Sequence, residues 1–298
     1  MVDRFQPPGF ESRSVNTSLG TMVYYTASGG ESDAAPPLVF LHSVGGGSSA
    51  YEWSKVYPAF AGRYRVLAPD LVGWGQSAHP VRDYQVADYH QMLGELLAAA
   101  TATPAVVVAS SLTAGMVIRL AIEQPTWFRA LLLVCPTGFG DFGLDYQRGL
   151  AAQLARVPGL DRLLYAVGAA NAEAVRNFMA QFLFARRDRI SEEMVQAYLA
   201  SALQPNAEYA ALASLRGDLC FDLARYVGQL TVPTAVFWGE EARFTPCETG
   251  RRLATLNPQA VKSFEAIAET GVWPHLELPA VMIGLLERSL RQLLADPR

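Results

Sequence analysis

The stretch from residue 105 to residue 121, A-V-V-V-A-S-S-L-T-A-G-M-V-I-R-L-A, constrains the fold more than any other part of the chain. It opens with the β-branched run 106–108, which is typical of a buried strand. It ends with apolar residues at 116, 117, 120 and 121, spaced as one face of a helix. Apart from Leu112, the residues between are small, so the pattern predicts a strand that turns directly into a helix and lifts one hydroxyl above a sheet.

Length and composition limit the classes of protein that fit. The 298 residues can form one large α/β domain or two smaller ones, and 51% hydrophobic with 17% charged residues indicates a globular chain. A net charge of −4 argues against nucleic acid or an anionic membrane as partner. We expect no signal peptide and no transmembrane segment, since the sequence has no apolar run of the required length.

The cysteines and histidines carry no metal-site spacing. The three cysteines are scattered, without a C-x-x-C pair, and are interpreted as free thiols in a reducing compartment, which predicts a cytoplasmic protein. Cys135 is expected to be a buried structural thiol, whereas Cys247 follows Pro246 at a helix start, where the dipole would lower its pKa. The four histidines form no H-E-x-x-H or similar cluster, so neither a metal nor a cofactor is predicted.

Strand-like and helix-like segments alternate along most of the chain, which predicts a mostly parallel sheet covered on both faces. Strands are expected within 15–28 (two, antiparallel) and at 38–41, 65–68, 106–108, 130–134, 232–238 and 261–267, and helices at 51–61, 83–100, 246–256 and from 274. Between residues 141 and 217 strand-like runs are absent and helical spacing dominates. A helical block placed between strands of one sheet predicts a cap.

With these elements in place, the chain resembles the α/β-hydrolase family, whose nucleophile elbow reads G-x-S-x-G. Ala109 and Thr113 stand where the family has glycines, and Ser111 takes the nucleophile position. Ser110 is the weaker candidate because it would place Leu112 where space is tightest. The resemblance implies an eight-stranded α/β-hydrolase core formed by residues 1–140 and 218–298, with residues 141–217 inserted as a helical cap.

A glycine-rich loop after the first buried strand, His42-Ser43-Val44-Gly45, looks like the family's H-G-x-G motif. In the family, two backbone amides hold the oxyanion of a tetrahedral intermediate. The resemblance assigns those amides to Val44 and Leu112. A phosphate-binding loop is the competing interpretation, but no Gly-Lys-Ser/Thr follows.

The other two triad positions are substituted. The family's acid lies in G-x-x-D after the seventh strand, where this chain has Ala242. Its base lies in a G-H motif before the last helix, where this chain has Val272. A serine hydroxyl is a poor nucleophile until a base takes its proton, so a conventional triad is not predicted.

Three other residues are candidates for the missing groups. His275, three residues after the base position, is interpreted as structural and alternatively as a displaced base. Asp141, after the sixth strand, and Glu241, next to the acid position, are alternative acids.

Three hypotheses therefore stand. The first is a protein that binds or transforms a small, uncharged, apolar molecule without serine-hydrolase chemistry, in a pocket lined by cap aromatics. The second is an ester or lactone hydrolase that uses Ser111 with His275 and either Asp141 or Glu241. The third is a non-catalytic interaction subunit with a protein partner, which predicts that side chains fill the space above Ser111.

Overall fold

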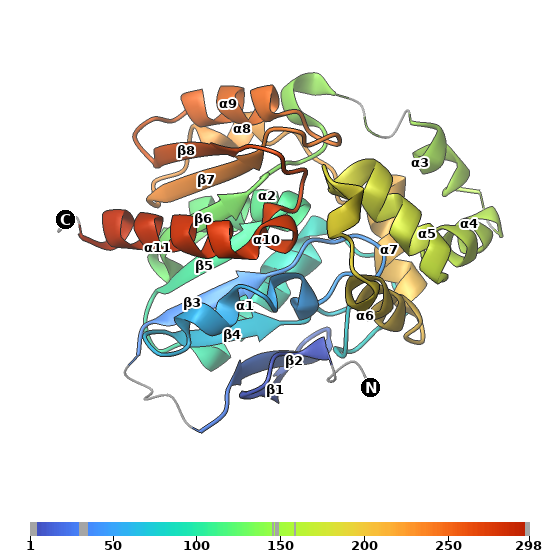
Figure 1. Cartoon of the computed structure of the whole chain (residues 1–298), viewed down its shortest axis with the longest axis horizontal. Helices are drawn as coiled ribbons and strands as arrows, with labels where there is room; N and C mark the ends of the chain where they lie inside the picture. The colour runs from blue at the N-terminus through green and yellow to red at the C-terminus, as the bar shows by residue number, and fades with distance from the viewer. Residues whose placement is uncertain (1–4, 30–34, 145, 147–148, 158, 296–298) are drawn as a thin grey trace.

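A central sheet of eight strands organises the protein (Figure 1). The computed structural model describes residues 5–29, 35–144, 146, 149–157 and 159–295. The strand order is β1-β2-β4-β3-β5-β6-β7-β8. The strands are β1 (Phe10–Thr17), β2 (Gly20–Ala27), β3 (Pro37–Leu41), β4 (Arg65–Pro69), β5 (Ala105–Ser110), β6 (Phe128–Val134), β7 (Thr234–Gly239) and β8 (Val261–Ile267).

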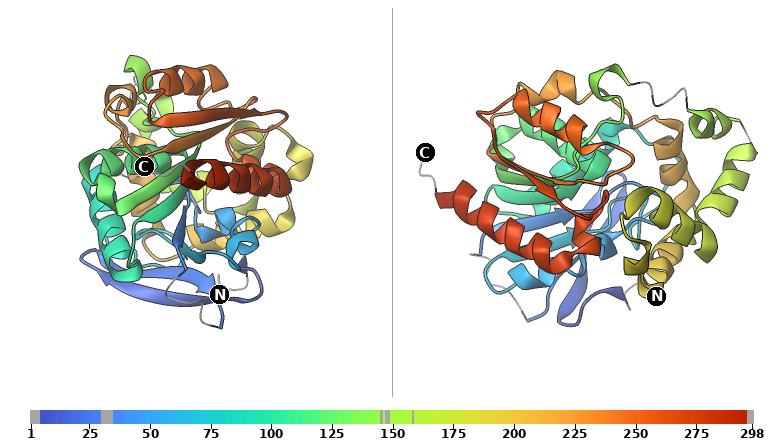
Figure 2. Two further views of the ribbon diagram at one scale, coloured as in Figure 1. Left: turned by 90° about the vertical axis from the view of Figure 1, so that its left-hand side faces the viewer. Right: turned by 45° about the horizontal axis from the view of Figure 1, so that its top comes forward.

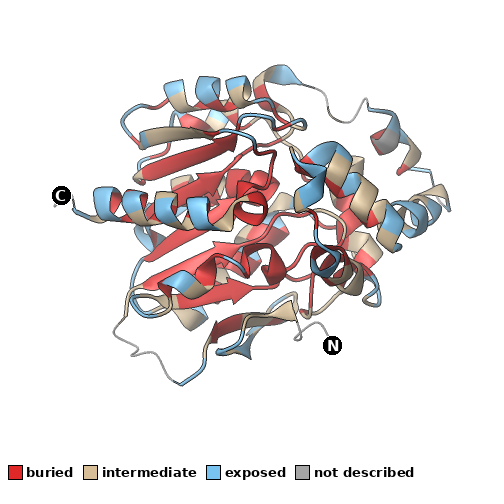
Figure 3. Cartoon of the chain, in the orientation of Figure 1, coloured by how far each residue is buried: buried red, intermediate tan, exposed pale blue. Residues whose placement is uncertain are grey.

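The sheet is mostly parallel, as predicted. β1 and β2 form an antiparallel hairpin, and β2 pairs antiparallel with β4. All later pairings are parallel, for example Val39 opposite Val107 and Val108 opposite Leu132. β3 and β5 are buried along their whole length, because helices cover both faces of a parallel sheet (Figure 3).

Helices pack on both faces of the sheet. α1 and α2 lie on one face and α11 on the other (Figure 2). The helices of the core are α1 (Val86–Ala100), α2 (Ser111–Glu123), α8 (Ala224–Val227), α9 (Cys247–Thr255), α10 (Pro274–Glu277) and α11 (Pro279–Ala295). The predicted α/β-hydrolase architecture is therefore confirmed.

A second group of helices follows β6 in the sequence and precedes β7. It lies to one side of the sheet, on the right in Figure 1. Its members are α3 (Leu150–Leu154), α4 (Leu160–Gly168), α5 (Ala172–Phe178), the π-helical turn η7 (Met179–Leu183), α6 (Glu192–Ala202) and α7 (Ala207–Arg216). We refer to these elements as the cap helices. The exact domain limits at 140/141 and 217/218 remain a prediction.

Prolines interrupt two of the predicted helices. The helix predicted over 51–61 is instead two 3-10 helices, η2 (Ala50–Trp53) and η3 (Tyr57–Phe60), because Pro58 has no N–H to donate. The helix predicted from Pro274 divides into α10 and α11 at Pro279 for the same reason.

α1 begins three residues later than predicted, where Gln85 and Asp88 form a capping box.

No helix among the described residues combines the length and the apolar character that a membrane crossing requires.

Candidate functional site

Ser111 occupies a strained turn between β5 and α2. Its φ of 52° lies in the left-handed region, which non-glycine residues rarely adopt. The turn is closely packed. A Cβ added at Gly115 would lie 2.3 Å from the carbonyl oxygen of Thr137. The strand–turn–helix predicted from the sequence is present, with Ala109 and Thr113 buried in place of the two glycines.

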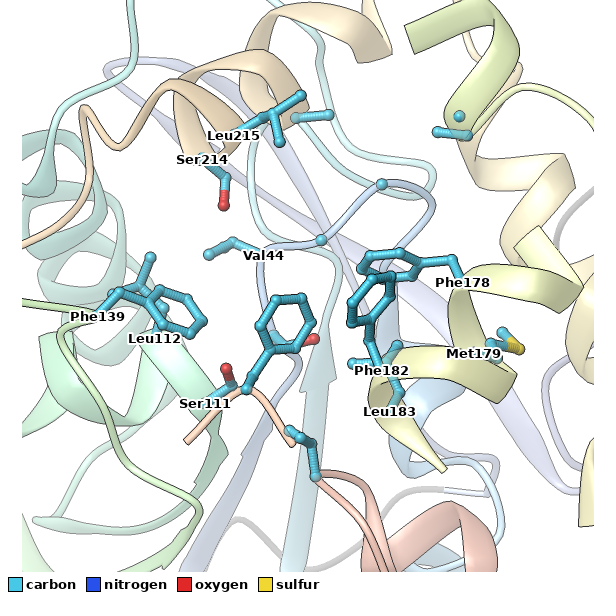
Figure 4. A pocket seen from close by; sticks show the side chains of 18 of the residues that line it. Val44, Ser111, Leu112, Phe139, Phe178, Met179, Phe182, Leu183, Ser214 and Leu215 are labelled. Carbon is cyan, nitrogen blue, oxygen red and sulfur yellow. The ribbon is translucent and has the colours of Figure 1, made fainter. Parts of the chain in front are cut away.

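Val44 and Leu112, whose amides are expected to hold the oxyanion, lie at the same cavity as Ser111. All three residues line one cavity (Figure 4). Leu112 is the second residue of α2, where the backbone N–H has no intrahelical acceptor. Within the described part of the chain, neither amide donates a hydrogen bond. Two unpaired N–H groups beside a hydroxyl suit a ligand with a carbonyl oxygen.

Valine and alanine occupy the two substituted triad positions within adjoining loops. Val272 lines the same cavity as Ser111, and Ala242 is buried. The amide of Glu241 donates to the carbonyl of Thr270 at 2.9 Å, so the two loops are in direct contact. The hydroxyl of Ser111 has no hydrogen-bond partner among the residues that the structure describes. The structure thus places the apolar side chain of Val272 in the wall of the cavity that Ser111 lines.

His275 is paired with a different residue, one that the sequence analysis did not identify. Its Nε2 lies 3.2 Å from Oε1 of Glu52, and both side chains are fully buried. Its ring stacks on Trp53 with centroids 4.0 Å apart. Its Nδ1 has no partner among the described atoms. This imidazole therefore bonds Glu52 and not Ser111.

Glu52 is the centre of a buried polar cluster, formed by Glu52, Ser43, Ser110, Tyr198 and His275. Its carboxylate accepts the amide and hydroxyl of Ser43 at 3.0 and 2.6 Å, the hydroxyl of Ser110, and the hydroxyl of Tyr198 at 3.4 Å. Burial raises the pKa of Glu52, but its hydrogen bonds and the charge of His275 outweigh that effect and lower it overall. The carboxylate is therefore ionised at neutral pH.

A signal for Glu52 existed in the sequence. It lies between two aromatic residues in the segment Ala50-Tyr51-Glu52-Trp53, which follows the glycine-rich loop. A charged residue inside an apolar segment is seldom buried without partners. The partners, however, come from positions far apart in the sequence.

Neither Asp141 nor Glu241 is among the residues that line the cavity. Asp141 is buried and accepts the hydroxyl of Thr137 at 2.6 Å and the amides of Gly138 and Leu223 at 3.0 Å. Burial raises the pKa of Asp141. It joins the segment after β6 to the chain before β7, and it does not line the cavity. Glu241 is exposed.

The cysteine predictions have mixed outcomes. Cys135 is buried, which raises its pKa to about 12, as expected for a structural thiol. The prediction for Cys247 was wrong. Burial raises the pKa of this thiol, an effect larger than the lowering by the nearby Arg251.

The cavity above Ser111 has a volume of about 690 Å³ and a mostly apolar wall. Among the described residues that line it, none carries a charged side chain. Five aromatic residues from the cap and the segment that leads into it line the cavity, whereas Phe142 and Phe184 do not. The five are Phe139, Tyr146, Tyr165, Phe178 and Phe182.

Phe244 connects this wall to the core. Its ring lies 5.2 Å from that of Phe182 and 6.0 Å from those of Phe178 and Phe139. Phe182 belongs to the π-helical turn η7, a local irregularity that is frequent at functional sites. Such a wall suits a lipophilic ligand.

Metal-binding side chains are not grouped in the described residues. No set of three or more His, Cys, Asp or Glu side chains there is placed to hold a metal ion.

Comparison with known proteins gives the same fold. Residues 38–285 match the family model described as alpha/beta hydrolase family. A 2-hydroxy-6-oxo-6-phenylhexa-2,4-dienoate hydrolase of Burkholderia cepacia is 26% identical over 253 residues, which cover 80% of this chain and 83% of that protein. Lipase 1 of Psychrobacter immobilis is 25% identical over 254 residues, which cover 84% of this chain and 75% of that protein.

Solved structures are similar over almost the whole chain. A serine hydrolase involved in carbazole degradation has a TM-score of 0.76 at 20% identity and covers 95% of this chain and 99% of its own. The dienoate hydrolase BphD of Rhodococcus sp. strain RHA1 has a TM-score of 0.72 at 22% identity and covers 95% of this chain and 99% of its own. At these identities the structural similarity shows the fold alone.

Proposed function

Because the chain belongs to the α/β-hydrolase family, we propose that it binds an uncharged, lipophilic carbonyl compound in the cavity above Ser111, without conventional serine hydrolysis. The carbonyl oxygen accepts from the amides of Val44 and Leu112, and the Ser111 hydroxyl completes the polar end. Residues 141–217 act as the cap over this ligand.

The observation that carries the proposal is Val272 in the wall beside Ser111. Valine cannot accept a proton, so the serine stays a weak nucleophile. Triad losses of this kind cost on the order of 10⁶ in turnover, which is roughly 8 kcal/mol of barrier. We therefore expect a bound carbonyl compound to dissociate from this site unchanged far more often than it is hydrolysed there.

The absence of charge in the described lining supports a neutral ligand. Two relatives are named for dienoates, which carry a carboxylate. A carboxylate placed in this cavity would meet no lysine or arginine among the described lining residues, and it would lose its hydration.

Two measurements test the proposal. A fluorophosphonate probe should leave Ser111 unlabelled under conditions that label an active serine hydrolase. Titration with 2-undecanone should give saturable binding by calorimetry. Rapid hydrolysis of 4-nitrophenyl octanoate that disappears in Ser111→Ala would refute the proposal.

An ester or lactone hydrolase with a displaced base is the second candidate. It is favoured by the hydrolase names of the relatives and by the buried His275–Glu52 pair near the cavity. In this candidate His275 must leave Glu52 to reach Ser111. It predicts that His275→Ala abolishes ester hydrolysis, and unchanged hydrolysis rules it out.

The interaction-subunit hypothesis expects side chains to fill the space above Ser111, whereas that space is open.

The cysteines at 135, 220 and 247 are free, which supports the reducing, cytoplasmic location.

A further inference from the structure

Ser214 is a polar residue at the far side of the cavity for which the proposed function has no use. It belongs to α7, one of the cap helices, and is half-buried. Figure 4 shows Ser214 and Ser111 on opposite sides of the cavity, each with its hydroxyl oxygen directed toward the other side. The cavity thus has serine hydroxyls on two opposite sides.

The hydroxyls of Ser111 and Tyr146 also lack a partner within the described ranges, whereas the remaining cavity hydroxyls have protein partners. Ser43 and Tyr198 donate to Glu52, and Tyr165 donates to the carbonyl of Ala202 at 2.8 Å. A helical serine commonly bonds the carbonyl four residues earlier. Ser214 forms no such bond to Ala210, and its hydroxyl has no other partner within the described ranges. It is therefore free to bind a ligand.

The surface between the two hydroxyls is apolar. Val44, Leu112 and Phe139 lie between Ser111 and Ser214 in Figure 4, with Phe178 and Phe182 opposite. A ligand that spans this distance needs an apolar middle and an oxygen at each end.

We propose that Ser214 determines specificity by binding a second oxygen of the ligand, remote from the carbonyl that the Val44 and Leu112 amides hold. The inference rests on the proposed function and narrows its ligand class to lipophilic carbonyl compounds with a distal hydroxyl. The ligand's hydroxyl hydrogen-bonds the serine hydroxyl. A compound without that hydroxyl leaves Ser214 unpaired.

Binding of matched ketones tests this. The probes are 2-alkanones of about eight to fourteen carbons and their ω-hydroxy derivatives, for example 2-undecanone and 11-hydroxy-2-undecanone. Their dissociation constants are measured by calorimetry on the whole protein and on Ser214→Ala. Ser12→Ala, an exposed serine on β1, is the control for the substitution. Tyr146→Phe removes another cavity hydroxyl.

At one chain length, the distal hydroxyl should tighten binding about threefold to tenfold, as a single neutral hydrogen bond allows. Ser214→Ala should abolish that gain and leave the parent ketone unchanged, while Ser12→Ala and Tyr146→Phe should retain it. If the parent ketones bind but the hydroxyl adds nothing at any length, or its gain survives Ser214→Ala, the inference fails and the proposed function stands. If no ketone binds, both fail.

Discussion

Nε2 of His275 lies 3.2 Å from Oε1 of Glu52, and neither side chain is exposed. The pair joins α10, near the carboxyl end of the chain, to η2, which follows the glycine-rich loop. The same carboxylate accepts from Ser43 and Ser110, which immediately precede Val44 and Ser111. Through these two serines, Glu52 fixes the glycine-rich loop that carries Val44 and the turn that carries Ser111.

Replacing Glu52 should destabilise the whole protein. Glu52→Ala leaves the amide of Ser43, two serine hydroxyls and an imidazole without their acceptor, so we expect a loss of about 3–5 kcal/mol in the free energy of unfolding. Urea denaturation measures it. The exposed Glu241→Ala should change stability by less than about 0.5 kcal/mol. Equal effects of the two variants would contradict the role of Glu52.

The contribution of Glu52 should depend on pH with a definite sign. Its pKa in the folded protein is lowered from the ordinary value of 4.5. The carboxylate therefore adds stability that is present above pH 4.5 and is lost as the pH falls through its folded pKa. The difference in unfolding free energy between the wild-type protein and Glu52→Gln should shrink on acidification from pH 6 toward pH 3. A difference that grows instead would mean that the carboxyl is protonated in the folded state.

The sequence predicted the architecture because the fold depends on patterns that are local. Apolar runs such as 38–41 and 130–134 identify buried strands by themselves, and the small residues around Ser111 identify a tight turn. Two of the errors occurred where a proline, Pro58 or Pro279, changed the helix type or divided a helix.

The site was harder to predict because it depends on contacts between distant residues. The cluster around Glu52 includes partners 58, 146 and 223 positions away, so no local pattern shows it. Motif alignment located Ser111, Val44 and Leu112 at the cavity, since their spacing follows from the strand ends. Whether these residues act as proposed stays a prediction.

Restoring the family's base and acid should create hydrolase activity. Val272 lines the cavity with Ser111, and the loop of Ala242 contacts the loop of Val272 through the Glu241–Thr270 hydrogen bond. We expect Val272→His with Ala242→Asp to raise hydrolysis of 4-nitrophenyl octanoate at least about tenfold, because an imidazole can then accept the serine proton. Initial rates measure the gain.

The control for this gain is the same double substitution in a Ser111→Ala background. It should return hydrolysis to the wild-type level, since the new imidazole would have no nucleophile to activate. A gain that persists without Ser111 would show that the new histidine acts on water or on the ester directly, and would contradict Ser111 as the nucleophile position.

The thiols should differ in reactivity. Burial raises the pKa of the Cys135 and Cys220 thiols to about 12, whereas it raises the pKa of Cys247 less; Cys135 is buried, and Cys220 and Cys247 are both half-buried. At pH 8 Ellman's reagent should therefore react slowly with Cys247 in the native protein. It should react with Cys135 and Cys220 only after the protein is unfolded. Cys247→Ser should remove the native reaction. Rapid modification of native Cys135 would show that the strand end opens in solution.

Thr113 offers a route to a more stable protein. It takes the place of an elbow glycine, is buried, and its Oγ1 has no partner among the described atoms. Valine has nearly the same shape without the unpaired hydroxyl, so Thr113→Val should raise the free energy of unfolding by about 1–2 kcal/mol. Thr113→Ser keeps the hydroxyl and loses the methyl group, so it should lower that free energy by about 1 kcal/mol. Urea denaturation of the three proteins decides, and a destabilised valine variant would mean that the hydroxyl is hydrogen-bonded in solution.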